Sequence, residues 1–362
     1  MKKPAAILLI CLGILLSIAQ QTGAQWVQAG SPGGGGITSL IVSGKNLFAG
    51  TSNGGVFLST DDGATWTAVN SGLTNLNVTC LLMNGPDLLA GTAKGGIFLS
   101  ADNGTTWRVV NSGLPAETSV LCLAVGGANL FAGTNHGVLL SKNNGASWEK
   151  ASSGLPAKTS FSCLAASGQN LFAGTRYSGI FLSGDNGSSW KAVRSDLLKK
   201  NELLCIGATG TNLFAGTVYG GVFLSTNNGA TWKAVKSGMP ETEIHCLVAS
   251  GINLFAGTGG GLDALIDKGN IKQICHGAGV LMSTDNGTSW TVLNPGLPSY
   301  FGTRVETWIE CLAVSETHLF AGTQDGKVWR LRLPDLAVFA WLGQGQTYEQ
   351  AGRLLRKSGP KG

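Results

Sequence analysis

Carboxylate, amide and hydroxyl oxygens recur at fixed spacing in a turn of the form S-x-[DN]-x-G-x-x-W, which the chain carries six times. The residues of the six turns are, in chain order, Ser59, Asp61, Gly63, Trp66, Ser100, Asp102, Gly104, Trp107, Ser141, Asn143, Gly145, Trp148, Ser183, Asp185, Gly187, Trp190, Ser225, Asn227, Gly229, Trp232, Ser283, Asp285, Gly287 and Trp290. Acid-rich turns can bind calcium. Here, however, two copies carry Asn in place of Asp, and none has a glutamate at the spacing of a calcium loop. We therefore predict a structural turn and no metal site.

The same residue types suit a tight hairpin. The serine and Asp or Asn oxygens can accept backbone N–H groups that the hairpin leaves unpaired. The glycine permits a positive φ, and the tryptophan can bury a large ring between neighbouring sheets. Replacing Asp by Asn keeps an oxygen acceptor and removes only the charge, which agrees with a structural role in which hydrogen bonds hold the turn together.

Carboxylates outside these turns could support a second chemistry. Glycoside hydrolysis needs two carboxylates that face each other across a sugar. Acids in suitable loops are Glu117, Asp196, Glu202, Glu241, Glu243, Asp263, Asp267, Glu306 and Glu310. Several could lie on one rim, so hydrolysis stays open as an alternative. Scattered loop acids are more often solvated surface, and no motif calls for a cofactor.

Six cysteines follow the same periodicity and offer little chemistry. Cys80, Cys122, Cys163, Cys205, Cys246 and Cys311 occupy one position of successive repeats, where Ser39 stands in the first. Whole sheets would separate such positions by more than the ~4.4–6.8 Å between Cα atoms that a disulfide tolerates. We expect small buried side chains, with Cys275, beside His276, as the exception.

The elements that position these residues come from a repeat of roughly forty residues. The segment NLFAGT, beginning at Asn46, recurs in six further copies, four identical and two slightly altered, at Asp87, Asn129, Asn170, Asn212, Asn253 and His318. An apolar strand precedes each copy, and another strand follows it. Each repeat therefore supplies four short antiparallel strands. Packing such sheets radially around an axis covers both faces of each, which predicts a β-propeller.

The seventh repeat lacks the turn and the fourth strand. The segment Gln25–Gln28 matches the missing strand, with Trp26 in the tryptophan position. We therefore predict an all-β, seven-bladed propeller over residues 25–333, in which an N-terminal strand completes the last blade. An open solenoid is the alternative, but it would require a polar cap rather than a lone strand.

The S-x-D-x-G-x-x-W turns resemble the BNR, or Asp-box, repeats of sialidase-like propellers, and are similar to those of sortilin-type, xyloglucan-degrading and photosystem II assembly-factor propellers. In that family the turn lies on the face opposite the catalytic centre. A sialidase also needs an arginine triad and an Arg-Ile-Pro signature. The signature is missing, and only Arg176 and Arg304 are loop candidates for the triad. The resemblance implies the fold but not sialidase activity.

The N-terminus has the parts of a secretory signal. Lys2 and Lys3 precede an apolar run over residues 5–19, and Thr22 and Ala24 suit a cleavage site. We expect residues 1–24 to be removed and the protein to be secreted or periplasmic, without stable membrane insertion. An uncleaved anchor is the alternative, although a span needs about 20 residues. The formal charge of +5 includes both lysines, so nucleic acid is not an expected partner.

Differences among the repeats indicate where a partner could bind. The turn between the second and third strands varies freely, and residues 259–278 are inserted there in the sixth repeat. The next connecting loop, 295–310, is also enlarged, and both fall on one face. We predict that this face binds a protein or glycan through Tyr177, Tyr219, Tyr300, Phe301, Arg304 and Trp308. Drift in tolerant loops is the plainer interpretation.

The sequence thus favours an exported, non-enzymatic, monomeric binding or scaffold module without metal or cofactor. A glycoside hydrolase of the sialidase-like group and an assembly factor for a membrane complex are the alternatives. Residues 334–362 follow the last repeat as a tail, in which 347–357 could form a short basic helix.

Overall fold

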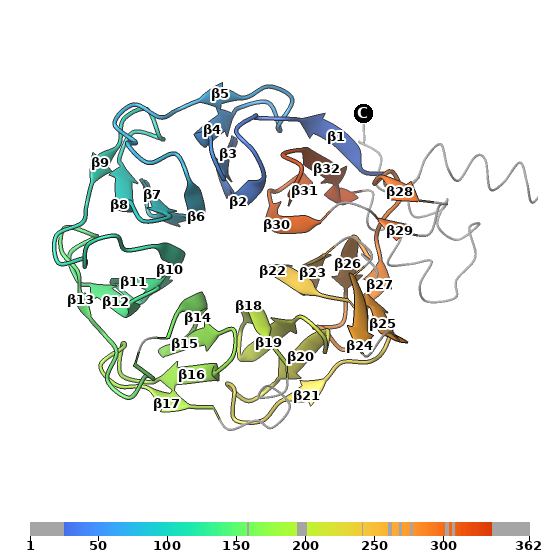
Figure 1. Cartoon of the computed structure of the whole chain (residues 1–362). Coiled ribbons are helices and arrows are strands. Elements are labelled where there is room, and N and C mark those ends of the chain that lie inside the picture. The colour runs from blue at the N-terminus through green and yellow to red at the C-terminus, as the bar shows by residue number, and fades with distance from the viewer. Residues whose placement is uncertain are drawn as a thin grey trace, which may run out of the picture.

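The computed structural model of the chain is a closed ring of sheets (Figure 1). It describes residues 25–157, 159–193, 201–240, 242–259, 263–267, 270–275, 278–300, 304–305 and 308–334. The predicted signal segment and nearly all of the predicted tail lie outside the described residues. Seven four-stranded antiparallel sheets surround one axis, which confirms the predicted fold class. The innermost strand of the last sheet, β30, packs against that of the first, β2, so the ring is closed rather than an open solenoid.

Each sheet forms one blade, and the strands run from the axis outward. In that order they are β2 (Ile37–Ser43), β3 (Asn46–Thr51), β4 (Gly55–Ser59) and β5 (Thr67–Ala68) in blade 1; β6 (Val78–Asn84), β7 (Asp87–Thr92), β8 (Gly96–Ser100) and β9 (Arg108–Val109) in blade 2; β10 (Val120–Gly126), β11 (Asn129–Thr134), β12 (Gly137–Ser141) and β13 (Glu149–Lys150) in blade 3; β14 (Phe161–Ser167), β15 (Asn170–Thr175), β16 (Gly179–Ser183) and β17 (Lys191–Ala192) in blade 4; β18 (Leu203–Thr209), β19 (Asn212–Thr217), β20 (Val222–Ser225) and β21 (Lys233–Ala234) in blade 5; β22 (Ile244–Ser250), β23 (Asn253–Thr258), β26 (Val280–Ser283) and β27 (Thr291–Val292) in blade 6; and β30 (Ile309–Val314), β31 (His318–Thr323), β32 (Val328–Arg332) and β1 (Val27–Gly30) in blade 7.

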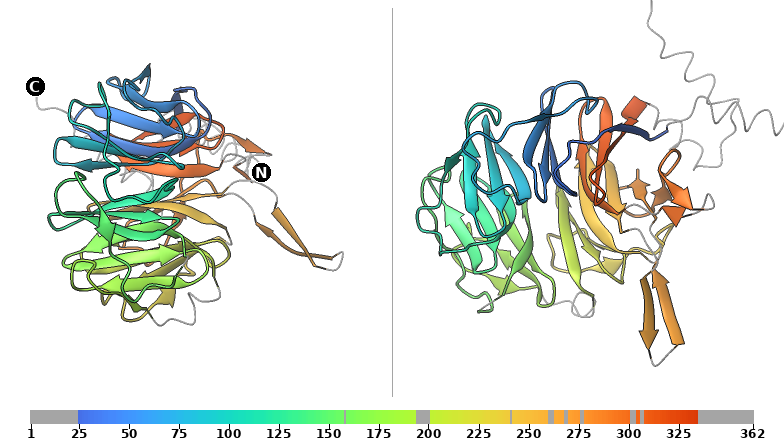
Figure 2. Two further views of the ribbon diagram at one scale, coloured as in Figure 1. Left: turned by 60° about the vertical axis from the view of Figure 1, so that its left-hand side comes forward. Right: turned by 45° about the horizontal axis from the view of Figure 1, so that its top comes forward.

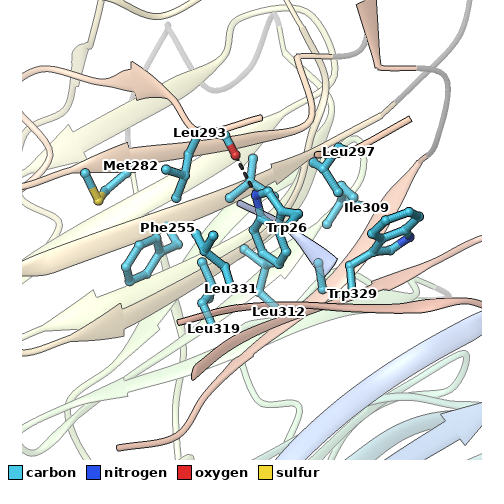
Figure 3. Close-up of a cluster of buried hydrophobic side chains, with 12 residues drawn as sticks. Trp26, Phe255, Met282, Leu293, Leu297, Ile309, Leu312, Leu319, Trp329 and Leu331 are labelled. Atoms are coloured by element: carbon cyan, nitrogen blue, oxygen red, sulfur yellow. Dashed lines mark hydrogen bonds between the residues drawn. The ribbon is translucent and has the colours of Figure 1, made fainter. Parts of the chain in front are cut away.

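The outermost strand of blade 7 is the N-terminal strand β1, which pairs antiparallel with β32. Trp26 immediately precedes it, and its side chain is only 2% exposed. The indole packs among Leu297, Ile309 and Leu331, and Nε1 donates a hydrogen bond to the carbonyl of Leu293 at 2.6 Å (Figure 3). Trp26 therefore joins the two ends of the described chain in one apolar cluster between blades 6 and 7.

The same tryptophan contact joins other blades. The indole Nε1 atoms of Trp107, Trp148 and Trp190 donate to backbone carbonyls of the preceding blade at 2.7, 3.0 and 2.7 Å. In each pair the acceptor lies three residues after that blade's own tryptophan. By this rule the Nε1 atoms of Trp66, Trp232 and Trp290 would donate to Ala29, Val193 and Val235. Trp232 instead donates to Gly229 of its own turn at 3.1 Å, and the Nε1 atoms of Trp66 and Trp290 have no partner.

The hydrogen bonds of the Asp-box lie within the turn and hold its backbone together, an arrangement that we call the staple. In blade 4 the Ser183 hydroxyl accepts the Gly187 N–H at 2.8 Å and donates to Asp185 Oδ1 at 2.7 Å. The Asp185 carboxylate in turn accepts the backbone N–H and the hydroxyl of Ser189 at 2.9 and 2.6 Å. These bonds, led by that from the Ser189 hydroxyl, lower the pKa of Asp185 to about 2. The charge stays on the turn and faces no cation among the described residues.

The asparagine copies keep the staple by reversing one hydrogen bond. Asn143 Oδ1 accepts the Ser147 N–H at 2.9 Å, as the carboxylate does elsewhere, while Asn143 Nδ2 donates to the Ser147 hydroxyl at 2.9 Å. A hydroxyl can serve as donor or acceptor, so both versions are satisfied. The glycine of each box has the predicted positive φ, and so does the residue before it, such as Asn144 at 54°. Asn and Asp tolerate that conformation better than most residues do.

This geometry predicts different effects on stability for two substitutions in the same turn. Ser183→Ala should lower the free energy of unfolding by about 1–3 kcal/mol, because it leaves the buried Gly187 N–H without an acceptor. Asp185→Asn should stay close to the wild type at neutral pH, because Asn143 already fills the same role. Guanidinium unfolding of both variants measures the contrast. A loss for Asp185→Asn as large as that for Ser183→Ala would contradict the staple.

The stabilisation from Asp185 also has a defined pH window. Its pKa in the folded protein is lowered from 3.8 to about 2. The contribution is therefore complete above the unfolded value and is lost as the pH falls towards 2. Asp185→Asn should remove this part of the acid sensitivity.

The cysteine positions differ partly from expectation. Each of the six repeat cysteines lies in an innermost strand, and none of these six forms a disulfide. Cys163 and Cys311 are buried as predicted, but Cys80, Cys122, Cys205 and Cys246 are only partly so. Cys122 and Cys205 Sγ also lie 3.5 and 3.4 Å from the first carbonyl of the next blade. Desolvation raises the pKa of Cys80 to about 12, which keeps this thiol protonated and unreactive.

Candidate functional site

The ring has two unlike faces. The Asp-boxes occupy one of them. On the other, the loop that leads into each innermost strand meets the turn between that blade's second and third strands. Backbone hydrogen bonds link the two at Val218 with Glu202, Gly259 with Glu243 and Gln324 with Trp308, at 2.9, 3.1 and 3.1 Å. We call this surface the lead-in face.

Each of the two enlarged segments of this face contains a short hairpin. The insertion in blade 6 contains the antiparallel pair β24 (Asp263–Asp267) and β25 (Asn270–Cys275). The enlarged loop before blade 7 contains β28 (Ser299–Tyr300) and β29 (Arg304–Val305). Figure 2 shows both pairs on the same side of the ring, with β24–β25 projecting furthest from it.

At the boundary of blades 4 and 5, an aromatic and two charged side chains meet on the lead-in face. Arg176 Nε donates to Glu202 Oε2 at 2.7 Å, and the Arg176 guanidinium lies 5.6 Å from the centre of the Tyr177 ring. The hydrogen bond with Glu202 raises the pKa of Arg176 further, despite partial burial. Tyr177 is 73% exposed, which makes it the most exposed large hydrophobic side chain described. The arginine thus supports a ring that water contacts.

At the boundary of blades 6 and 7, a histidine lies between two carboxylates. His245 Nε2 is 3.1 Å from Glu243 Oε2, and His245 Nδ1 is 3.5 Å from Glu310 Oε2. The ring of Trp308 meets the imidazole edge-on, with 5.2 Å between ring centroids. Burial alone would lower the pKa of His245. The hydrogen bonds with Glu310 and Glu243 outweigh it, so the pKa lies above its ordinary value of 6.5.

The predicted binding residues only partly come together. Tyr177 and Tyr219 are exposed in neighbouring turns of blades 4 and 5, and Trp308 is half-buried against His245. Tyr300 and Arg304 pair through their backbones in the β28–β29 hairpin. Phe301 lies outside the described residues. The described contacts thus form two groups, one at the boundary of blades 4 and 5 and one at the boundary of blades 6 and 7.

Sequence reasoning named Glu202, Glu243 and Glu310 only among many loop acids and missed His245 as a site residue. A usable signal existed. The second residue of the innermost strand is, from blade 1 to blade 7, Thr38, Thr79, Leu121, Ser162, Leu204, His245 and Glu310. Ionisable side chains at this position occur only in the last two blades. The residue before the strand also turns acidic, at Glu202 and Glu243, where blades 1 to 3 have Gly36, Asn77 and Ser119.

The position of His245 restricts what the two nearest carboxylates could do as a catalytic pair. Glu243 and Glu310 belong to adjacent blades, as a pair of catalytic carboxylates could, but the His245 ring lies between their oxygens. Hydrolysis needs that space for a sugar and a water molecule. Among the described residues, no group of three or more His, Cys, Asp or Glu side chains could hold a metal ion.

The fold and its Asp-box turns define a seven-bladed β-propeller of the BNR-like group. The chain belongs to the DUF6242 beta propeller domain family, and the match to this family covers residues 14–125 and 126–253. Among curated proteins, no sequence relative matches it.

Several solved structures share the fold at low identity. A GH74 xyloglucanase from Xanthomonas campestris is 17% identical with a TM-score of 0.63, over 86% of this chain and 54% of that one. The chain thus spans about half of that enzyme. YCF48 from Cyanidioschyzon merolae is 16% identical with a TM-score of 0.62, over 85% and 99%. The extracellular domain of a hybrid two-component system from B. thetaiotaomicron is 15% identical with a TM-score of 0.65, over 84% and 40%.

These likenesses support the fold and leave the activity open, because propellers of this shape serve different functions. In the part of the chain that the structure describes, no helix is long and apolar enough to cross a membrane.

Proposed function

We propose that the protein is an exported, non-enzymatic binding module that recognises a protein or glycan with its lead-in face. One observation carries the proposal. Departures from the repeat, both in loop length and in side-chain chemistry, gather on this face over blades 4 to 7, whereas the six Asp-box turns stay nearly uniform. The fold does not require an exposed Tyr177 or an ion pair at Glu202. Exposed aromatic and charged side chains without a structural task are typical of binding surfaces.

The structural neighbours support binding without identifying the ligand. YCF48 has also been solved bound to D1 peptide, at 16% identity and a TM-score of 0.62 to this chain. Two-component-system neighbours are extracellular domains, which agrees with the proposed export. We propose that this chain acts likewise outside the cytoplasm, as a monomer and without a cofactor.

The second candidate is a glycoside hydrolase, which the GH74 neighbours and the Glu243 and Glu310 carboxylates favour. It would require His245 to move from between the two acids. A panel of fluorogenic glycosides tests this directly. Turnover that Glu243→Gln and Glu310→Gln abolish would replace the binding proposal with the hydrolase.

Binding is tested with a glycan array and with affinity capture from the periplasm and outer surface of the source cells. The double variant Tyr177→Ala/Tyr219→Ala should weaken the recovered interaction at least about tenfold, because two exposed aromatic anchors are lost. The matched control is Val109→Ala/Val292→Ala, which removes side chains that are 52% and 46% exposed on outer strands. Equal binding by the two double variants would show that the ligand contacts another surface. Recovery of membrane subunits would identify an assembly factor.

A further inference from the structure

At six of the seven blade boundaries, a side chain of one innermost strand contacts a backbone carbonyl of the next, that of the strand's first residue. The pairing of each innermost strand with the second strand of its blade shifts register directly after this residue, as at Ile37 and Val78. The Thr38 hydroxyl donates to the Val78 carbonyl at 2.8 Å, and the Thr79 hydroxyl donates to the Val120 carbonyl. Cys122 and Cys205 make the corresponding contacts at 3.5 and 3.4 Å. This is the ordinary way in which adjacent blades meet at the lead-in face.

At the boundary between blades 6 and 7 this contact is long. The Cys246 Sγ lies 3.9 Å from the Ile309 carbonyl, close to the 3.8 Å of Cys311 at the boundary of blades 7 and 1 and longer than the thiol contacts of blades 3 and 5. A thiol is a weak donor even at shorter distance. His245, which precedes Cys246, instead reaches across to Glu310 of blade 7. A side-chain ion pair therefore reinforces a boundary that has only a weak backbone contact.

The imidazole is held closely on several sides. A Cβ added to Gly259 would lie 3.1 Å from His245 Nε2 and 3.3 Å from Glu243 Oε2, so the glycine leaves the room that this pair occupies. The Trp308 ring covers another edge. Among the described residues, the charged groups that face the imidazole are Glu243, from the lead-in to its own strand, and Glu310, from β30.

We propose that His245 is a positioning residue: as an imidazolium it bridges blades 6 and 7 and holds Trp308 edge-on at the lead-in face, so that the shape presented there depends on pH. That this shape affects a ligand rests on the proposed function; the bridge itself does not. A neutral imidazole can donate from only one ring nitrogen, so it must give up the hydrogen bond to one of the two carboxylates.

The pH window follows from the sign of the shift. The pKa of His245 is raised above 6.5 in the folded protein. The stabilisation is therefore complete below pH 6.5 and is lost as the pH rises through the folded value. The bridge should therefore hold the boundary at pH values below 6.5 and loosen as the pH rises through the folded-state pKa of His245.

Two measurements on the whole protein test the bridge without any ligand. The first is a pH titration of the His245 ring nitrogens by NMR. Glu310→Gln should lower its midpoint by about one pH unit or more. Burial disfavours the imidazolium, and Glu243 would then be the only carboxylate left to stabilise it. The ring signals of the exposed His136 in blade 3 are the internal control, and Glu310→Gln should leave them unchanged.

The second measurement is the fluorescence of Trp308, obtained as the difference between wild type and Trp308→Phe. An imidazolium in contact with an indole quenches its emission, because the cation accepts an electron from the excited ring. Emission from Trp308 should therefore rise with pH through the His245 midpoint, and His245→Gln should abolish the rise. A midpoint that Glu310→Gln leaves unchanged, or a flat Trp308 signal in wild type, would overturn the proposal.

These outcomes are separate from those of the binding experiment. A pH-dependent bridge with no effect of Tyr177→Ala/Tyr219→Ala on binding would keep the positioning role and move the ligand elsewhere. A flat titration with lost binding in the double tyrosine variant would keep the binding face and discard the bridge.

Discussion

Trp26→Ala should lower the free energy of unfolding by about 3–5 kcal/mol, the cost of emptying a well-packed tryptophan site. The side chain is 2% exposed and lies among apolar residues of blades 6 and 7. Its loss also removes the hydrogen bond from Nε1 to the Leu293 carbonyl. Because β1 is the outer strand of blade 7, the variant also weakens the attachment of the N-terminal strand to the ring.

Two variants serve as graded controls for Trp26. Val27→Ala alters a side chain that is 54% exposed on the same strand, and it should change stability by less than about 0.5 kcal/mol. Trp66→Ala removes a half-buried indole whose Nε1 has no partner, so its effect should be intermediate. Chemical denaturation of the three variants gives the order directly. A Trp26→Ala protein as stable as Val27→Ala would mean that β1 does not help to hold the ring together.

Gly133→Ala should cost about 1–3 kcal/mol or more, because the site is already filled. This glycine is the fifth residue of an NLFAGT segment. A Cβ placed on it would lie 2.5 Å from Cys122 Sγ and 2.7 Å from the backbone oxygen of Phe161 in blade 4. The thiol could turn aside, but the carbonyl belongs to the next blade and can yield only if the blades separate.

Gly184→Ala is the matched control, since a Cβ there would meet nothing closer than 3.6 Å and other Asp-boxes carry larger residues at this position. It should leave stability within about 0.5 kcal/mol of wild type. The double variant Cys122→Ala/Gly133→Ala should recover only part of the loss, because the Phe161 carbonyl remains. Thermal unfolding ranks the three proteins. Full recovery in the double variant would show that the thiol alone sets the cost and that the blades are not in tight contact at this point.

Residues with a local task were predictable from the chain alone. The Asp-box oxygens, its glycine and its tryptophan act within one turn or against the adjacent blade, and they recur with each repeat. Internal comparison could therefore separate the structural part from the variable part. The tolerance of Asn143 in an acid's position predicted a structural turn, and Asn143 makes hydrogen bonds to Ser147 in the same place as the acids do. The seventh repeat, which lacks the turn and the fourth strand, likewise indicated a ring of seven blades.

Contacts between different blades were harder to anticipate. Glu202, Glu243 and Glu310 looked like scattered loop acids, because the residues they contact are not fixed by the repeat. Arg176 reaches Glu202 across 26 positions, and His245 reaches Glu310 across 65. The unpaired indoles of Trp66 and Trp290 were equally unforeseen, because the spacing that pairs Trp107 and Trp148 with the preceding blade is the same for them.

The Asp-box oxygens, which recur in six of the seven repeats, therefore belong to the scaffold. Repetition along the sequence determined this, since a group needed in almost every blade answers a need of the fold. The histidine between two carboxylates occurs once, and its parts become neighbours only when the ring places the starts of β22 and β30 side by side. Ring geometry brings these unlike residues together because it sets equivalent strand positions of adjacent blades against one another, whatever side chains they carry.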